Sequence, residues 1–191
     1  MQAENQPGAD AARLERLVAR QAEKRHLAAI WAARAGLAAG MTVLDIGAGT
    51  GALALEYAAL GARVLAMDPD SASLAHAAAE AVRRGLALET MVGRAETLAA
   101  LHVAPDRVML TDALHHMHER DTALRAIRAA MKPSGALFIA EYDPAGPGAV
   151  GAPMARRMAP AEAQALLAAA GFSAAAAEAG PDEHYTILAV P

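Results

Sequence analysis

Three glycines and two acids in the first third of the chain carry a clear chemical signal. Gly47, Gly49 and Gly51 alternate directly after an apolar run at residues 42–46. Glycine tolerates positive φ and lets backbone approach a ligand closely, and the first amides of a helix have no partners within that helix. The pattern predicts a strand, a tight turn and a helix that together hold a nucleotide or nucleoside. The spacing differs from the G-x-G-x-x-G of dinucleotide sites.

The two acids strengthen this interpretation. Asp45 lies inside the apolar strand end, two residues before Gly47. Asp68 ends the next predicted strand, about 20 residues after the glycines, where this architecture places a ribose ligand. A carboxylate can accept hydrogen bonds from both vicinal hydroxyls of a ribose. A tight strand-to-helix turn without any ligand would explain the glycines alone, but it would not explain the two acids.

Candidate catalytic residues follow the later strands. His116 comes after the predicted strand at 107–111, and Glu141 closes the one at 136–142. The ordinary pKa of histidine suits a general base, and a glutamate at a strand end could accept a proton or bind an amine. Both residues also allow a plainer interpretation, as packing for the histidine and as a surface carboxylate for Glu141. His115 and His118 form a His-x-x-His pair, but no third ligand is marked, so no metal is expected.

The long connection at residues 143–158 could form a lid. It is rich in Pro and Gly and carries Arg156 and Arg157. Loops often carry binding residues, and arginine recognises carboxylate and phosphate groups. A connection with two solvated arginines is the equal alternative.

The elements that must position these residues alternate between strand and helix. Predicted strands cover residues 42–46, 63–67, 87–91, 107–111 and 136–142, each followed by a helical pattern. This rhythm predicts an α/β fold with a parallel sheet, helices on both faces and right-handed crossovers. Two further runs, 172–179 and 184–190, are joined closely by Gly180, Pro181 and Asp182, which predicts an antiparallel hairpin.

The N-terminal part of the chain is expected to be helical. Residues 11–36 read as one long helix, or as two with a soft junction at the charged run 23–26. We therefore divide the chain into a helical cap or lid segment at 1–36, with residues 1–10 expected to be disordered, and a single domain at 37–191. A homodimer is left open.

Composition narrows the classes of function. The 191 residues include no cysteine, which excludes disulfides and thiolate chemistry. The polar N-terminus does not resemble a signal peptide, and no apolar run is long enough to span a membrane, so a cytoplasmic location is expected. The net charge of −4 argues weakly against nucleic acid as a partner, and 3% aromatic residues leave few platforms for stacking bases.

Taken together, these blocks resemble the class I S-adenosylmethionine-dependent methyltransferases, and most of all the broad group that includes ubiquinone- and menaquinone-biosynthesis enzymes. The resemblance covers roughly residues 36–190. It rests on residues 43–51, Asp68, and residues 93–98, 106–116, 124–135 and 169–172. It implies a Rossmann-like seven-stranded sheet in the order 3-2-1-4-5-7-6, with strand 7 antiparallel, and S-adenosyl-L-methionine as the cofactor.

The resemblance also implies roles for individual residues. The three glycines would pass beneath the methionine part of the cofactor, and Asp45 would hold its amino group. Asp68 would take the ribose hydroxyls. The remaining cofactor residues implied here are Met67, Pro69, Ala95 and Glu96 around the adenine, and Asp112 near the methionine carboxylate or the substrate. Arg94 stands where the family often has an aspartate that accepts from the adenine amino group, and arginine cannot accept a hydrogen bond.

The implied function is methyl transfer to a small-molecule acceptor by in-line displacement. Most of the protein's work is then alignment of the acceptor and exclusion of water, and a base is needed only where the acceptor loses a proton. A methyltransferase acting on protein or RNA, and a non-catalytic protein that binds S-adenosylmethionine, are the alternatives. A nicotinamide-dependent oxidoreductase is disfavoured by the glycine spacing and by the absence of a Tyr-x-x-x-Lys pair. The substrate and the acceptor atom (O, N, C or S) are left open.

Overall fold

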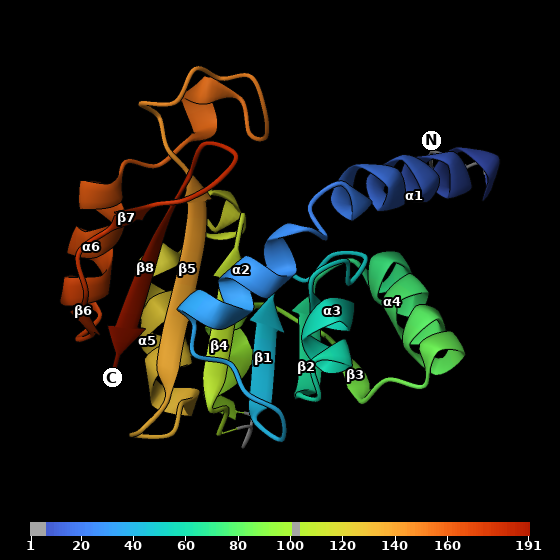
Figure 1. The fold of residues 1–191 in the computed structure, drawn as a ribbon, viewed down its shortest axis with the longest axis horizontal. Helices are drawn as coiled ribbons and strands as arrows, with labels where there is room; N and C mark the ends of the chain where they lie inside the picture. Colours follow the sequence, from blue (N-terminus) through green and yellow to red (C-terminus); the bar gives the residue numbers. More distant parts are fainter. Residues whose placement is uncertain (1–6, 101–103) are drawn as a thin grey trace, which may run out of the picture.

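The central sheet has the order β3-β2-β1-β4-β5-β8-β6, with β7 also paired to β8 (Figure 1). A computed structural model describes residues 7–100 and 104–191 of the chain. The strands are β1 (Thr42–Ile46), β2 (Arg63–Asp68), β3 (Leu88–Val92), β4 (Arg107–Thr111), β5 (Ala136–Tyr142), β6 (Ser173–Ala174), β7 (Glu178–Ala179) and β8 (His184–Val190). The α-helices are α1 (Pro7–Ala22), α2 (Leu27–Arg34), α3 (Ala54–Ala59), α4 (Ser71–Arg84), α5 (Arg120–Ala130) and α6 (Pro160–Ala169). Short 3₁₀ helices are η1 (Ala95–Ala100), η2 (Leu114–His116) and η3 (Met154–Arg156).

The predicted α/β fold and strand order are confirmed, with one difference at the last hairpin. β1 to β5 pair in parallel, and β8 pairs antiparallel to β5, so that β8 takes the place of the predicted seventh strand. The predicted sixth strand, at 172–179, is divided into β6 and β7, which both pair with β8. Three alanines, residues 175–177, lie between them. Alanine is a weak strand former because it offers no branched side chain to pack on the pleat.

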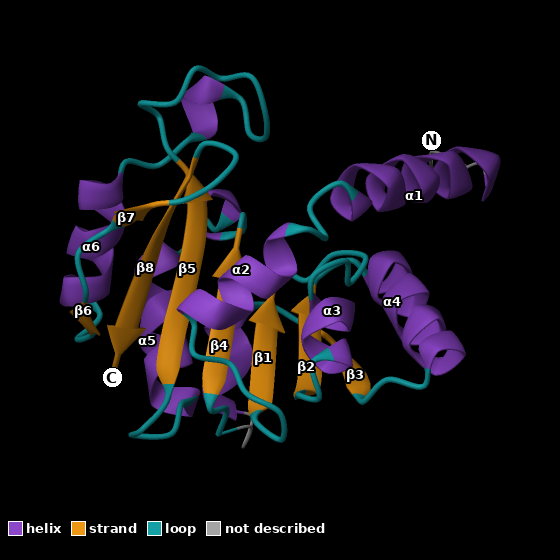
Figure 2. Cartoon of the chain, in the orientation of Figure 1, coloured by secondary structure: helices purple, strands orange, loops and turns teal. Residues whose placement is uncertain are grey.

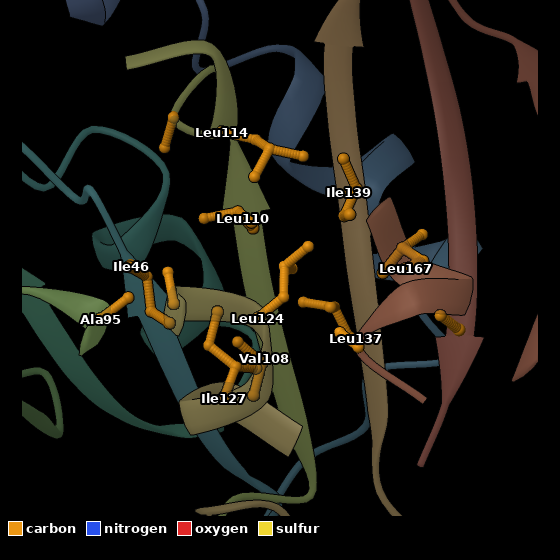
Figure 3. Close-up of a cluster of buried hydrophobic side chains, with 14 of the residues drawn as sticks. Ile46, Ala95, Val108, Leu110, Leu114, Leu124, Ile127, Leu137, Ile139 and Leu167 are labelled. Atoms are coloured by element: carbon orange, nitrogen blue, oxygen red, sulfur yellow. The ribbon is translucent and has the colours of Figure 1, made fainter. Parts of the chain in front are cut away.

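Alternate residues of each central strand face opposite layers of helices, as a parallel sheet covered on both sides requires. On one face, strand residues such as Ile46, Val108 and Leu137 pack against α5 and α6 (Figure 3). On the other face, Val43, Met109 and Phe138 pack against α2 and α3. Figure 2 shows these helices on the two sides of the sheet. The two layers hold the carboxyl ends of the strands in a fixed row.

The N-terminal helices split where the soft junction was predicted, at residues 23–26. α2 belongs to the core, because Trp31 is 1% exposed and its ring lies 5.7 Å from Phe138 and 5.4 Å from His184. α1 instead extends away from the sheet, above the start of α4 (Figure 1). Within the segment 1–10, for which disorder is predicted, residues 7–10 form the first turn of α1; the disorder of the segment stays a prediction. Proline suits the first turn of a helix, since it needs no amide hydrogen there. Residues 1–6 lie outside the described part of the chain.

Candidate functional site

A cavity of about 1180 Å³ opens at the carboxyl ends of β1, β2, β4 and β5. This is the edge at which open α/β sheets bind ligands. Its volume exceeds the roughly 300–1,000 Å³ of a typical small-molecule pocket, so it has room for a cofactor and a second molecule. The junction after α1 closes one side of the cavity, and the connection between β5 and η3 closes another.

The glycine turn adopts the backbone conformation that its sequence predicts. Gly47, Gly49 and Gly51 have φ angles of 75°, 53° and 78°. A Cβ atom on Gly47 would lie 2.7 Å from the Cβ of Ala113, and one on Gly51 would lie 2.7 Å from the Cβ of Ala77. Only Gly47 of the three lines the cavity. The turn therefore needs its glycines for close packing as well as for positive φ.

Asp45 lies in the wall of the cavity with no protein hydrogen bond among the described residues. It is 2% exposed, and burial together with the nearby charge of Asp68 raises its pKa to about 7. The hydroxyl of Tyr57 is also buried without a partner, and burial and the charge of Asp45 raise the pKa of that phenol. An unpaired buried carboxylate is costly. A cationic ligand group beside Asp45 would relieve that cost.

Asp68 is held in place by backbone amides. Its Oδ2 accepts from the amide of Gly49 at 2.9 Å and its Oδ1 accepts from the amide of Asp70 at 2.8 Å. Each carboxylate oxygen has a further lone pair, so Asp68 can still accept from two hydroxyls in the cavity that it lines. The structure thus fixes the orientation of this carboxylate before any ligand binds.

Of the other residues predicted to contact the adenine, three line the cavity and one does not. Pro69, Ala95 and Glu96 line the cavity, and so does Arg94. Met67 does not, because it is 1% exposed and packs in the core beside α5. The alternation of β2 turns its side chain into the sheet face, while its carbonyl accepts from the amides of Gly47 and Ala48 at 2.8 and 3.1 Å. Its contribution is to hold the glycine turn.

Two basic side chains of the protein compensate the negative charge of Asp112. It forms an ion pair with Lys24, from the junction between α1 and α2, and accepts from His184 Nε2 of β8 at 2.9 Å. Burial acts to raise the pKa of Asp112, but the hydrogen bond from His184 and the charge of Lys24 outweigh it and lower that pKa. Lys24 also lies 5.2 Å from the centre of the Tyr142 ring. Asp112 therefore ties the N-terminal segment and β8 to the edge of the cavity.

Glu141 pairs with His115, and not with His116. Its Oε2 lies 2.6 Å from His115 Nδ1, and its Oε1 accepts from the His115 amide at 3.3 Å. The two side chains are only 1% and 3% exposed. His115 lines the cavity, whereas Glu141 lies behind it. Among the described residues, His115 Nε2 has no hydrogen-bond partner. The atom is not fully buried, so this nitrogen is available to a ligand.

His116 lines the same cavity beside His115, with 4.0 Å between the ring centres. Burial lowers the pKa of His116, and the positive charges of His115, Arg156 and Arg20 lower it further, against an opposing effect of Asp112. Arg156 and Arg20 come from η3 and α1. Basic side chains from three segments that are far apart in the sequence thus line the same cavity.

The two neighbouring arginines of the 143–158 connection have different roles. Arg156 is exposed and lines the cavity. Arg157 is buried: it donates to Glu183 Oε2 at 2.6 Å and to the carbonyl of Asp143 at 2.9 Å. Glu183 also accepts from the amides of Gly148 and Ala149 at 2.8 and 2.7 Å. The connection is therefore fastened to the β7–β8 turn through one carboxylate.

Sequence reasoning missed the contributions of α1 and its junction. Gln21 Oε1 accepts from both the amide and the hydroxyl of Thr50, at 2.8 and 2.7 Å. A Cβ atom on Gly49 would lie 2.4 Å from Gln21 Nε2. Lys24 and His26 also line the cavity. A polar residue on a predicted helix gives no signal of a partner that lies far away in the sequence, so these contacts could not be read from the chain.

Among the described residues, no group of three or more His, Cys, Asp or Glu side chains could hold a metal ion. None of the helices described is long and apolar enough to cross a membrane.

Comparisons with known proteins define the class of this fold and site. Residues 44–139, half of the chain, match the family described as "Methyltransferase domain". A ubiquinone biosynthesis O-methyltransferase of Caulobacter vibrioides is 36% identical over 105 residues, which cover 54% of this chain and 42% of the relative. The chain thus spans less than half the length of this relative.

Two solved structures extend the likeness over most of the chain. A S-adenosylmethionine-dependent methyltransferase from Aquifex aeolicus has a TM-score of 0.76 at 21% identity, over 82% of this chain and 85% of its own. A Burkholderia thailandensis 1,6-didemethyltoxoflavin-N1-methyltransferase, solved with bound 1,6-didemethyltoxoflavin and S-adenosylhomocysteine, has a TM-score of 0.68 at 25% identity. It covers 100% of this chain and 92% of its own. The chain belongs to the methyltransferase domain family, with the class I S-adenosylmethionine-dependent fold.

The residues of this cavity fit the cofactor of that class. Asp45 offers an unpaired carboxylate for an ammonium group, Asp68 offers two oriented oxygens for a diol, and the glycine turn admits close backbone contact. The fit rests on the donors and acceptors of this chain.

Proposed function

We propose that this protein transfers a methyl group from S-adenosyl-L-methionine to a hydroxyl group of a small molecule. The observation that carries the proposal is the buried pair of Glu141 and His115, with His115 Nε2 left available at the cavity. A base in this position is useful only for an acceptor that carries a proton. The name of the Caulobacter vibrioides relative, an O-methyltransferase, supports oxygen as the acceptor atom.

The residues on the β1–β2 side of the cavity would bind the cofactor. Asp45 would pair with the ammonium group of the methionine part, and the glycine turn, through Gly47, would lie against that part. Asp68 would accept from the ribose hydroxyls, with Pro69, Ala95 and Glu96 around the adenine. When bound there, S-adenosylmethionine supplies an electrophilic methyl group on a sulfonium centre.

The residues on the β4–β5 side would prepare the acceptor. His115 Nε2 accepts the proton that leaves the acceptor hydroxyl as the oxygen takes up the methyl group. Glu141, 2.6 Å from Nδ1, fixes the tautomer of His115 and stabilises the positive charge that the ring gains. Glu141 therefore acts through His115. His116, the residue that the sequence favours as base, lies beside this pair and would contact the acceptor.

The size and placement of the cavity favour a small molecule over a protein or RNA. Elements on both sides, the junction after α1 and the 149–153 stretch, contribute to its lining, so an acceptor has to enter between them. The net charge of −4 also disfavours RNA. A cytoplasmic location and a homodimer stay predictions.

Calorimetric titration with S-adenosylmethionine, S-adenosylhomocysteine and NADH tests the cofactor. We expect the first two to bind and NADH not to bind, whereas binding of NADH alone would overturn the proposal. A labelled-methyl assay over a panel of phenols and other hydroxylated metabolites then tests the chemistry. Cofactor binding without methyl transfer to any acceptor would instead favour the non-catalytic alternative.

A further inference from the structure

Some of the cationic side chains around the cavity have an acidic partner among the described residues, and others do not. Lys24 is paired with Asp112, and His26 Nε2 lies 2.7 Å from Asp182. Arg20 and Arg156 also line the cavity, yet neither has a side-chain hydrogen bond or ion pair within residues 7–100 and 104–191. Both side chains belong to exposed residues and are free to turn toward a ligand.

These two arginines line the same cavity as His116. Arg20 comes from α1, His116 from η2 and Arg156 from η3. Burial lowers the pKa of His116, and the charges of His115, Arg156 and Arg20 lower it further. Two guanidinium charges at one cavity favour an anion bound between them.

The acids of the cavity do not supply that anion. Asp45 and Asp68 lie on the β1–β2 side, where the proposed cofactor groups would engage them, and Glu96 belongs to the same side, after β3. Asp112 is already engaged by Lys24 and His184. Asp182 is engaged by His26, and Glu23, which also lines this side, forms no ion pair with either arginine among the described residues. Arg20 and Arg156 are therefore the cations of this side that are left without an ion-pair partner in the described part of the chain.

We propose that the acceptor molecule carries an oxyanion, a carboxylate or a phosphate ester, which Arg20 and Arg156 bind over His116. This inference names the substrate class of the proposed function and rests on it. Arginine suits the task because its planar guanidinium donates two parallel hydrogen bonds to carboxylate and phosphate oxygens. The anion would fix the acceptor at one end, while its hydroxyl group lies toward His115 Nε2.

Binding to the complex with S-adenosylhomocysteine tests the inference without turnover. Benzoate and phenyl phosphate are the two anionic probes, and benzamide is the neutral one. We expect at least one anion to bind about tenfold more tightly than benzamide at low ionic strength, and the affinity to fall as salt is added. The preferred anion tells a carboxylate from a phosphate ester. Equal binding of all three probes, or no binding of either anion at millimolar concentration, would overturn the inference.

Single substitutions test whether the two arginines bind the anion. Arg156→Gln and Arg20→Gln should each weaken anion binding about fivefold or more, since each removes a charged hydrogen-bonding partner. Arg16→Gln is the matched control, because Arg16 lies on the same helix as Arg20 but does not line the cavity. An equal loss in all three variants would show a general charge effect and reject the site.

Titration of His116 by NMR gives a second readout. The groups that act on its pKa are His115, Arg156 and Arg20, which lower it, and Asp112, which raises it. A bound anion would offset the arginines, so the pKa of His116 should rise when the preferred probe is added. No change at a saturating concentration of that probe would contradict the inference. Failure of S-adenosylhomocysteine itself to bind would instead refute the proposed function, so the two failures are distinguishable.

Discussion

Gln21 of α1 and Thr50 of the glycine turn are joined by two hydrogen bonds to the same oxygen, at 2.8 and 2.7 Å. Through this contact, the helix that extends away from the sheet touches the turn on which the proposed cofactor site is built. α1 makes a second contact through Arg13, which donates to Asp70 at 3.1 Å. The position of α1 and the state of the site should therefore be coupled.

Gln21→Ala should loosen α1 and weaken the binding of S-adenosylhomocysteine. Loss of two hydrogen bonds of about 1 kcal/mol each predicts faster proteolysis of α1 and an affinity reduced by roughly tenfold. Limited proteolysis and calorimetry measure the two effects. Gln164→Ala is the matched control, because among the described residues the side chain of Gln164, on α6, hydrogen-bonds only to the carbonyl of Ala175 and does not line the cavity. A variant that keeps both wild-type properties would show that the contact is incidental.

Asp45→Asn should stabilise the ligand-free protein at alkaline pH. Burial raises the folded-state pKa of Asp45 to about 7 from an ordinary value near 4, so the folded state holds the proton more tightly than the unfolded state. The stability from this proton is complete below pH 4 and is lost as the pH rises through 7. The loss is at most about 4 kcal/mol. Thermal unfolding at pH 5.5 and 8 should show a gain for Asp45→Asn that is about half developed at pH 5.5 and complete at pH 8, and Asp10→Asn, at an exposed residue, should show none.

The same carboxylate predicts how cofactor affinity depends on pH. The ammonium group of S-adenosylhomocysteine needs an ionised Asp45, so binding should strengthen as the pH rises from 5.5 to 7, by up to about tenfold per pH unit. Calorimetry across this range gives the slope. In Asp45→Asn the affinity should be lower and nearly independent of pH. A wild-type slope of zero would remove Asp45 from the ammonium site.

Glu141→Gln should slow methyl transfer without affecting cofactor binding. The amide keeps the size of the side chain but cannot stabilise a charged His115 ring, so kcat should fall about 10² to 10⁴-fold, with little change in KM or in S-adenosylhomocysteine affinity. His116→Gln, at the neighbouring histidine, should mainly raise KM. Loss of cofactor affinity in Glu141→Gln would indicate a structural role for the buried pair.

Glu183→Gln should release the connection between β5 and η3. The hydrogen bond from Arg157 and those from three backbone amides lower the pKa of Glu183 to about 2. Its stabilising effect is therefore present above the ordinary pKa of glutamate and is lost as the pH falls toward 2. At pH 7, hydrogen exchange should become faster at Gly148, Ala149 and Val150 in the variant. Glu178→Gln, on exposed β7, should leave these amides unchanged, and equal exchange in all three proteins would refute the role of Glu183.

Local patterns predicted most of the fold and most of the residues that line the β1–β2 side of the cavity. The glycine turn, Asp45 and Asp68 lie at strand ends that a single segment defines, and the apolar runs fix the strands. Met67 shows the limit of this reasoning, because being next to Asp68 in the sequence turned its side chain into the core and away from the cavity. The pairing of Glu141 with His115, and not His116, depends on the register between neighbouring strand ends. The contacts of Gln21 and Lys24 join segments far apart in the chain, which no local pattern encodes.

β8 is synthesised after every other strand, yet it lies inside the sheet between β5 and β6. It brings His184, the partner of Asp112, to the edge of the cavity. Until β8 has left the ribosome, β5 is an unpaired edge strand. All of its residues are buried in the folded protein, and an exposed apolar edge strand promotes aggregation. The β4–β5 side of the cavity can therefore be completed only once β8 has emerged, and a nascent chain that stops before β8 would be a natural substrate for chaperones.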